Sequence, residues 1–543
     1  MKIVECVPNI SEGRRPEVYN EIAEAAARVA GVRLLDVDPG QETNRTVITF
    51  VGGPEAVIEG AFQLIKRSYE LIDMREHSGA HSRQGATDVC PFVPVSGLTV
   101  DECVEMAHAL ARRVGEELEV PVYLYEAAAT RPERQSLADI RQGEYEALPE
   151  KLKTDEFKPD YGPARFVPSF GAMVIGVRKF LVAYNVDLNV TDSRWANRVA
   201  FDVREKGRMV PGPDGTKVQQ PGMLKAVRGV GWYIPEYGCA QVSMNLIDLD
   251  VTPLHVAFDA CDESARNRGI RVTGSELVGL VPRKSIVDAG VHYLKRMSRS
   301  PGVPYADVVH AAIRSLGLSE VAEFDPKEKI IEDLLAPERP LASMTLQQFA
   351  DETSRDSTAP GGGSVAALAG ALGAALAAMV ANLPHPKSAF TGVVDELESI
   401  SVRGQEVKQA LLDAIDDDTW AFQKVMEAAK LPDAERATAT REATLGAAAV
   451  PLRVVELCPE IVDLCRRSLE VGMKASASDA GVGAAMARSA AVGAAMNVRI
   501  NLQDMVDDSD AAEMLRRSDT ALEATEKQAD ALVAEVWKRL GRG

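Results

Sequence analysis

The chain has 543 residues, 26% of them charged, a length that exceeds what one hydrophobic core supports and predicts two to four domains. Its formal net charge of -19 argues against a nucleic-acid-binding protein, because neutralising phosphates requires a basic face. The seven cysteines form no CxxC pair, and the N-terminal residues form no apolar signal segment. We therefore expect reduced thiols and a cytoplasmic location.

The first 130 residues alternate between strand-like and helical periodicity. The order strand, helix, strand, strand, helix, strand is typical of a ferredoxin-like α/β sandwich, and a weaker copy of it follows residue 172. In the first copy the predicted strands cover residues 2–7, 32–38, 45–51, 88–95 and 120–126, and the predicted helices cover residues 16–29, 54–72 and 101–118.

Beyond residue 333 the strand patterns vanish, and alanine, leucine, glutamate and arginine recur at helical spacing. We therefore predict an α+β N-terminal half of two ferredoxin-like α/β sandwich subdomains, followed by an all-α helical bundle. The expected limits are residues 1–180 and 181–333 for the two subdomains, 334–343 for a linker and 344–543 for the helical domain.

One segment of the helical half has two interpretations. Residues 364–383 contain no charged side chain, and twenty such residues are long enough to cross a bilayer. Most of them are small, however, and small residues also allow helices to approach closely within a bundle. We favour the bundle and expect no membrane contact.

Two histidines, His77 and His81, lie four positions apart in a loop before an apolar strand. That spacing suits a metal ion only on a continuous helix, but Ser78 and Gly79 interrupt it, and no third ligand is close in the sequence. Two interpretations remain: a solvated loop histidine, or a catalytic histidine at the mouth of a sheet.

Three glycine-containing segments have features of anion sites. Arg165 lies in one such segment, and Lys225 and Arg228 lie in another; their cationic groups suit carboxylates. The third segment opens the predicted small-residue helix, where free backbone N–H groups favour an anion. It lacks the GK[ST] sequence of a nucleotide-binding P-loop, and its candidate residues are Gly361, Gly362, Gly363 and Ser364.

Asp418 stands out in the predicted helix 406–428. The apolar stripe of this helix runs through Val407, Leu411 and Ile415 and continues at Phe422 and Val425, and position 418 belongs to it. A carboxyl group on a buried face has a raised pKa and is a candidate general base; the alternative is an aspartate that a neighbouring helix satisfies. The nearby residues Asp413, Asp416 and Asp417 are expected to be solvated.

Several long segments resemble a known family. "VECVPNISEGR", "LLDVDPGQETNRTVITFVG", "GAHSRQGATDVCPFVPV" and "GEYEALPEKL" are similar to glutamate formimidoyltransferases, and "APGGGSVAALAGALGAALAAMV" with "NVRINLQD" is similar to formimidoyltetrahydrofolate cyclodeaminases. Their order and the whole length resemble the fused bifunctional formimidoyltransferase-cyclodeaminase family. One departure is residues 208–222, which are longer than the connection usual in that family and put the placement of Lys225 in doubt.

The resemblance implies a reaction sequence. The formimino group of N-formimino-L-glutamate passes to N5 of tetrahydrofolate, and 5-formiminotetrahydrofolate then cyclises to 5,10-methenyltetrahydrofolate with release of ammonia. Tetrahydrofolate, in its polyglutamylated form, is a co-substrate, and no metal, NAD or flavin is expected. The family also implies a homo-oligomer, a ring of dimers.

The resemblance assigns roles to residues as well. The catalytic histidine corresponds to His81 and the cyclodeaminase aspartate to Asp418, while Asp38 and Arg45 lie in a matching motif of the transferase site and His77 has no catalytic role. The two folate-binding segments correspond to Gly162, Pro163, Ala164, Arg165, Phe166, Val167, Pro168, Ser169, Phe170 and Gly171, and to Gly222, Met223, Leu224, Lys225, Ala226, Val227, Arg228, Gly229 and Val230.

Two alternatives stay open at this point. Either domain alone could be catalytic, with the other serving for binding or oligomerisation, and the donor could be formylglutamate instead of formiminoglutamate.

Overall fold

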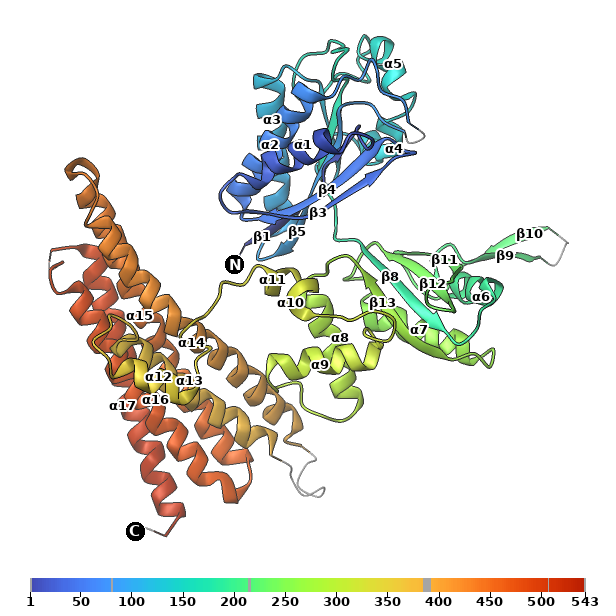
Figure 1. The fold of residues 1–543 in the computed structure, drawn as a ribbon. Coiled ribbons are helices and arrows are strands. Elements are labelled where there is room, and N and C mark those ends of the chain that lie inside the picture. The colour runs from blue at the N-terminus through green and yellow to red at the C-terminus, as the bar shows by residue number, and fades with distance from the viewer. Residues whose placement is uncertain (1, 80–81, 213–215, 384–391, 506, 542–543) are drawn as a thin grey trace. The chain divides into compact units, whose positions relative to one another are not determined.

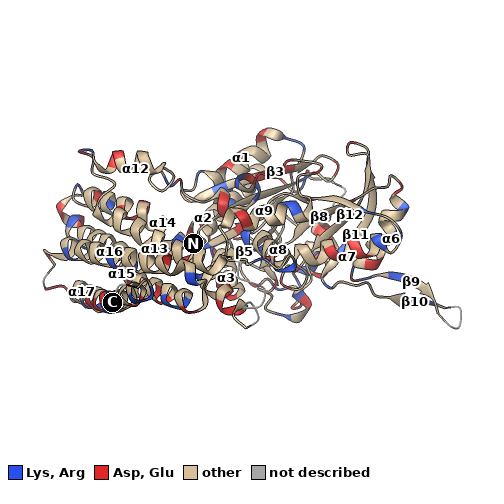
Figure 2. Ribbon diagram, turned by 90° about the horizontal axis from the view of Figure 1, so that it is seen from below, with Lys and Arg blue, Asp and Glu red and all other residues tan. Residues whose placement is uncertain are grey.

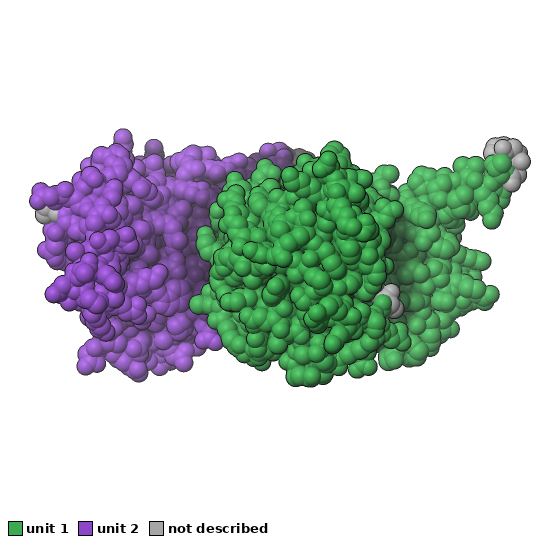
Figure 3. Space-filling model, turned by 90° about the horizontal axis from the view of Figure 1, so that it is seen from above, with its two compact units in different colours: residues 1–286, 316–335 green, residues 287–315, 336–543 purple. Residues whose placement is uncertain are grey.

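The computed structural model describes residues 2–79, 82–212, 216–383, 392–505 and 507–541. Contacts divide the chain into two compact units, which are coloured separately in Figure 3. The first unit comprises residues 1–286 and 316–335, and the second comprises residues 287–315 and 336–543.

The first unit begins with a seven-stranded mixed sheet. Strand β3 lies at one edge beside β4, then come β1 and β2, which both lie between β4 and β5, and β7 and β6 complete the order. The β5–β7 and β6–β7 pairs are parallel, and all the other pairs are antiparallel. The strands are β1 (Ile3–Cys6), β2 (Asn9–Ile10), β3 (Val32–Gly40), β4 (Arg45–Gly52), β5 (Thr87–Ser96), β6 (Val122–Glu126) and β7 (Met173–Val177).

Helices cover the two faces of this sheet unequally. One face packs its apolar side chains against three long helices, α1 (Pro16–Ala27), α2 (Pro54–Leu71) and α3 (Val100–Glu117). On the other face a small cluster joins β5, β6 and β7 to two short helices, α4 (Leu137–Ile140) and α5 (Glu144–Lys151). A 3-10 turn (Pro132–Arg134) contacts β6. Ile3 and Val51 on the same face pack against Ile331.

The second sheet of this unit is the four-stranded ferredoxin-like sheet that the sequence predicts. Its strands are β8 (Val182–Leu188), β11 (Val227–Ile234), β12 (Cys239–Leu246) and β13 (Val272–Val278), and the order β11-β12-β8-β13 is antiparallel throughout. Helices α6 (Ser193–Val203) and α7 (Leu254–Arg266) pack on one face. Within residues 208–222, β9 (Arg208–Pro211) and β10 (Lys217–Gln220) pair as a two-stranded antiparallel sheet.

Four helices follow this sheet, and the unit boundary runs through them. They are α8 (Arg283–Arg296), α9 (Tyr305–Leu316), α10 (Pro326–Lys329) and α11 (Ile331–Leu334). Residues 287–315 group with the helical unit, because Lys295 lies 2.6 Å from Glu398 and the amide of Asn382 donates to the carbonyl of Gly302. The domain limits expected from the sequence did not include this grouping.

The second unit is the expected all-α bundle. Besides residues 287–315, it contains α12 (Leu346–Thr353), α13 (Gly362–Asn382), α14 (Val394–Ala428), α15 (Asp433–Val471), α16 (Ala477–Leu502) and α17 (Ser509–Arg539), with a 3-10 turn at Lys474–Ser476. Small residues allow the helices to approach closely: a Cβ on Gly373 would lie 2.9 Å from the carbonyl oxygen of Gly483. The fold class predicted from the sequence is therefore confirmed.

Helix α13 is the segment with two interpretations. Among the described residues it is the helix that is long and apolar enough to cross a membrane, with a mean hydropathy of 2.0 over its most apolar window, and 61% of that window is buried. It carries no charged residue (Figure 2) and packs directly against α14, α15 and α16. These contacts favour its interpretation as a core helix of the bundle.

Candidate active sites

His81 lies outside the described residues, so its predicted catalytic role stays a prediction. The other histidine of the pair, His77, is half-buried: its Nε2 lies 2.9 Å from the carbonyl oxygen of Asn44, and its Nδ1 accepts from Nε of Arg83 at 3.3 Å. Burial lowers the pKa of His77, which favours a neutral ring that donates through Nε2. His77 is therefore a structural residue of the loop and is more enclosed than a solvated loop histidine.

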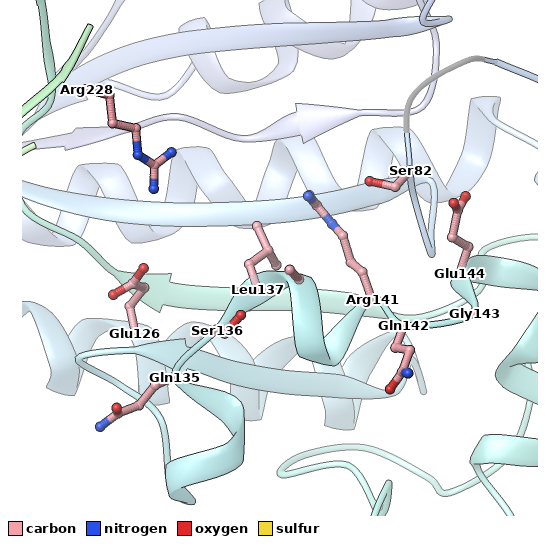
Figure 4. Close-up of a pocket in the computed structure, with 11 residues that line it drawn as sticks. Ser82, Glu126, Gln135, Ser136, Leu137, Arg141, Gln142, Gly143, Glu144 and Arg228 are labelled. Atoms are coloured by element: carbon pink, nitrogen blue, oxygen red, sulfur yellow. The ribbon is translucent and has the colours of Figure 1, made fainter. Parts of the chain in front are cut away.

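Ser82, the residue after His81, lines a cavity of about 740 Å³ in the first unit. Figure 4 draws Ser82, Arg141 and Glu144 toward one end of this cavity and Glu126 and Arg228 toward the other. The full lining is Ser82, Glu126, Gln135, Ser136, Leu137, Ala138, Arg141, Gln142, Gly143, Glu144 and Arg228. Side chains from both sheets of the unit thus meet around one polar space.

A second cavity of about 700 Å³ shares Glu126 and Arg228 with the first and also reaches Ala226. Three of the six described non-glycine residues with a positive φ angle line these two cavities. Glu126, Glu144 and Ala226 have φ angles of 53°, 57° and 54°, in the left-handed region that residues with a Cβ seldom adopt. Such strain often accompanies functional sites. Burial raises the pKa of Glu126, and Arg178 opposes that shift.

A buried ion cluster supports the Ser82 end of the cavity. Asp88 is fully buried, and its Oδ2 accepts from Arg45 at 2.5 Å and also from Arg141. Its Oδ1 accepts the backbone N–H of Gln84 at 3.0 Å. Two guanidinium groups therefore share one carboxylate, which leaves a surplus positive charge where Arg141 meets the cavity.

The predicted transferase residues Asp38 and Arg45 are not brought together. Arg45 belongs to the Asp88 cluster, whereas Asp38 is exposed on β3 and does not line either cavity. The sequence did not single out Asp88, Arg141 or Glu126. Asp88 does end the matching "H-x-R-x-G-A-x-D" segment, and that aspartate was the one available signal.

The two predicted folate segments differ in their relation to the cavities. From the second segment, Ala226 and Arg228 line them, and Lys225 is exposed with its Nζ 3.8 Å from Glu205. No residue of 162–171 is in the lining of either cavity, and Arg165 is exposed and paired with Glu119. The structure therefore supports Arg228 as a binding residue more directly than Arg165.

In the helical unit, the carboxylate of Asp418 lies against the start of α13. A Cβ built on Gly363 would lie 2.5 Å from Oδ2 and 2.6 Å from Cγ of Asp418, so only glycine leaves room for this approach. Burial raises the pKa of Asp418, and hydrogen bonds from the N–H and the hydroxyl of Ser364 oppose that shift. The hydroxyl of Ser364 also reaches the carbonyl of Ile415 at 2.8 Å.

Three expectations for this region need correction. The first is that residues 361–364 would bind an anionic ligand; in the structure the carboxylate of Asp418 lies against the start of α13 instead. Secondly, Asp416 is not solvated: it is 1% exposed and accepts the backbone N–H groups of Leu341 and Ala342 at 2.9 and 3.0 Å. Finally, Phe422 is 45% exposed, so the apolar stripe is not buried beyond Asp418.

The start of α13 also approaches a residue that the sequence did not single out. A Cβ on Gly362 would lie 3.2 Å from Nδ2 of Asn497 on α16, and this amide donates to the carbonyl of Gly493 at 2.8 Å. Asp418 on α14 and Asn497 on α16 therefore both approach the first residues of α13. Within the described ranges, no group of three or more His, Cys, Asp or Glu side chains could hold a metal ion.

A polar cavity with shared ion pairs and a carboxylate against a helix N-terminus are features of an enzyme for charged small molecules. Family models agree with this class. The model described as "Formiminotransferase domain, N-terminal subdomain" matches residues 3–178, "Formiminotransferase domain" matches residues 183–336, and "Formiminotransferase-cyclodeaminase" matches residues 345–520.

Similar proteins cover the chain as a whole and in parts. The formimidoyltransferase-cyclodeaminase of Rattus norvegicus is 43% identical over 99% of both chains. The glutamate formimidoyltransferase of Streptococcus pyogenes is 40% identical over 54% of this chain and 94% of its own. A methenyltetrahydrofolate cyclohydrolase of Methylorubrum extorquens is 34% identical over 36% of this chain and 94% of its own. The chain belongs to the formimidoyltransferase-cyclodeaminase family.

Proposed function

We propose that this chain is a bifunctional folate enzyme. Its first unit transfers the formimino group of N-formimino-L-glutamate to N5 of tetrahydrofolate and releases glutamate. Its second unit closes 5-formiminotetrahydrofolate to 5,10-methenyltetrahydrofolate and releases ammonia. The observation that carries this proposal is the full-length similarity to formimidoyltransferase-cyclodeaminases, and the two separate polar sites in the two units agree with it.

In the transfer step, N5 loses a proton as it attacks the formimino carbon, and the departing glutamate nitrogen gains one. An imidazole that titrates near neutral pH can perform both proton transfers, and we assign this role to His81. Ser82, the next residue in the sequence, lines the cavity, and this supports the assignment. Arg45 would act through Asp88 by holding Arg141 in place.

In the cyclisation step, N10 attacks the formimino carbon attached to N5, and ammonia leaves after gaining a proton. We assign Asp418 as the base that accepts the N10 proton. The raised pKa of its carboxyl group makes it a stronger base than an exposed aspartate. Ser364 would fix the orientation of the carboxylate, and the small size of Gly363 leaves room for it.

The folate co-substrate would carry a polyglutamyl tail, for which cationic side chains are the natural partners. Segments 162–171 and 222–230 remain our candidates for binding it. The support is strongest for Arg228, which lines both cavities and has no ion pair within the described part of the chain.

Separate assays of the two steps test the assignment. His81→Ala should abolish glutamate release and leave ring closure of supplied 5-formiminotetrahydrofolate intact, and Asp418→Ala should do the opposite. Loss of both activities in either variant, with the protein still folded, would contradict the two-site assignment. Measuring N-formyl-L-glutamate beside N-formimino-L-glutamate identifies the donor.

We also propose that the chain self-associates through α13 and α16. These helices pack against each other, and each carries an exposed apolar stripe: Val365, Leu372 and Met379 on α13, and Val482, Met496 and Ile500 on α16. Exposed apolar patches of this kind mark interaction surfaces. Leu372→Glu combined with Met496→Glu should lower the mass found by sedimentation, and an unchanged mass would contradict this interface.

A cytoplasmic location is proposed as well. All seven cysteines are free thiols, as expected of a protein kept in a reducing compartment. Fractionation of cells that express the full chain tests this location.

A further inference from the structure

The Ser82 end of the transferase cavity has a second group of shared ion pairs. Here one arginine pairs with two glutamates, whereas at Asp88 one aspartate pairs with two arginines. Nη1 of Arg83 lies 3.0 Å from Oε2 of Glu144, and the same guanidinium binds both oxygens of Glu146 at 2.9 and 2.7 Å. Two carboxylates therefore share one guanidinium. The surplus charge here is negative, whereas it is positive at Asp88.

One short turn carries both surplus charges into the cavity. Arg141 and Glu144 are separated by two residues, and Gly143 and Glu144 have φ angles of 80° and 57°. The N–H of Glu144 donates to the carbonyl of Arg141 at 2.7 Å, and the N–H of Tyr145 donates to the carbonyl of Arg83 at 2.9 Å. This strained but well-bonded turn fixes a guanidinium and a carboxylate beside Ser82.

Of the two glutamates on Arg83, only Glu144 lines the cavity. The bonds to Arg83 use its Oε2, and no side chain or backbone group of the described residues bonds to its Oε1. Glu146 does not line the cavity and uses both oxygens on Arg83. Of the two glutamates on Arg83, Glu144 is thus the one that can accept a hydrogen bond from a ligand in the cavity.

We propose that Glu144 recognises the amidinium group of the donor and makes the cavity select a formimino over a formyl donor, an inference that rests on the function proposed above. N-Formimino-L-glutamate carries two carboxylates and one amidinium, which is protonated at neutral pH. Arg141 matches one of the carboxylates, and Glu144 matches the amidinium beside the catalytic loop. N-Formyl-L-glutamate carries a neutral amide in place of the amidinium and gains nothing from a carboxylate there.

The test compares the two donors in the full-length protein, with tetrahydrofolate as acceptor and L-glutamate release as the common readout. Glu144→Gln should lower kcat/KM for N-formimino-L-glutamate by about 10- to 100-fold, the effect of losing one hydrogen bond to a charged group. For N-formyl-L-glutamate it should change kcat/KM by less than about threefold by the same reasoning. Glu146→Gln is the matched control, because it also removes a partner of Arg83, and it should leave the donor ratio unchanged.

A second measurement keeps the inference testable if Glu144→Gln folds poorly. Formamidinium should compete with the formimino donor in the unsubstituted protein and in Glu144→Asp, which retains the charge. The inference would be overturned if Glu144→Gln left the ratio of kcat/KM for the two donors unchanged. It would also be overturned if Glu146→Gln or Glu126→Gln altered this ratio to the same degree, or if formamidinium did not compete with the formimino donor. Failure of the unsubstituted protein to release glutamate from either donor would instead overturn the proposed function.

Discussion

The approach of the Asp418 carboxylate to Gly363 leads to a sharp prediction for Gly363→Ala. The added Cβ would lie 2.5 Å from Oδ2 of Asp418, whereas ordinary contacts begin near 3.4 Å. The carboxylate must therefore move by about 1 Å, and a misplacement of that size lowers the rate of a catalysed step by about 100-fold, which corresponds to about 2.7 kcal/mol in activation free energy. The fold should persist, because alanine is the better helix former.

Ammonia release from supplied 5-formiminotetrahydrofolate measures this effect, and glutamate release by the transferase domain is the internal control. Gly446→Ala on α15 is the matched substitution, because a Cβ there meets nothing within 4 Å, and it should leave both rates unchanged. Full ring-closing activity in Gly363→Ala, together with an inactive Asp418→Ala, would refute the idea that the position of this carboxylate limits catalysis.

Three further predictions follow from buried carboxyl groups. Burial raises the pKa of Asp418 above 3.8. As the pH is lowered, the ring-closing rate should therefore begin to fall at a higher pH than it would with an exposed aspartate as the base. A midpoint of this fall at the ordinary aspartate pKa would contradict the assignment. Asp88→Asn weakens the hold on two buried guanidinium groups and should lower the free energy of unfolding of the transferase unit by about 3–5 kcal/mol in urea titrations. Burial raises the pKa of Glu5 from 4.5 to about 7, so the folded state is favoured at low pH and loses stability as the pH rises from 4.5 to 7. Glu5→Gln should therefore stabilise the unit by about 3 kcal/mol at pH 8 and have little effect at pH 4.

Local periodicity was sufficient to predict most strands of the first sheet and its three long helices. Alternation of apolar residues identified β1, β3, β4, β5 and β6 within a few residues of their observed limits. The sequence did not indicate that β7 inserts between β5 and β6 as a parallel strand, because the choice of strand partner depends on tertiary packing. The grouping of residues 287–315 with the bundle also depends on contacts between residues distant in the sequence.

Whether the environment of a polar residue could be predicted depended on where its partners lie in the sequence. Asp418 could be found because its apolar neighbours recur within one helix. Asp416 was misjudged because its partners are the backbone N–H groups of Leu341 and Ala342, more than seventy positions away. Backbone donors have no side-chain signature, so a sequence pattern cannot reveal them. The same reason kept Asp88 and Arg141, which are 53 positions apart, from being recognised as a pair.

The two proposed sites share one electrostatic feature. In each site a charged side chain is stabilised only in part by neighbouring groups of opposite polarity. At Asp418 the N–H and hydroxyl of Ser364 favour the carboxylate while burial disfavours it, and the net shift is toward a higher pKa. At the transferase cavity each shared ion pair leaves one charge over, positive beside Asp88 and negative beside Arg83. A fully compensated pair would offer a substrate nothing, and an isolated buried charge would be too costly. Partial compensation leaves a charge available for a ligand or a proton, at the half-buried Asp418 and at Glu144, whose side chain is 41% exposed.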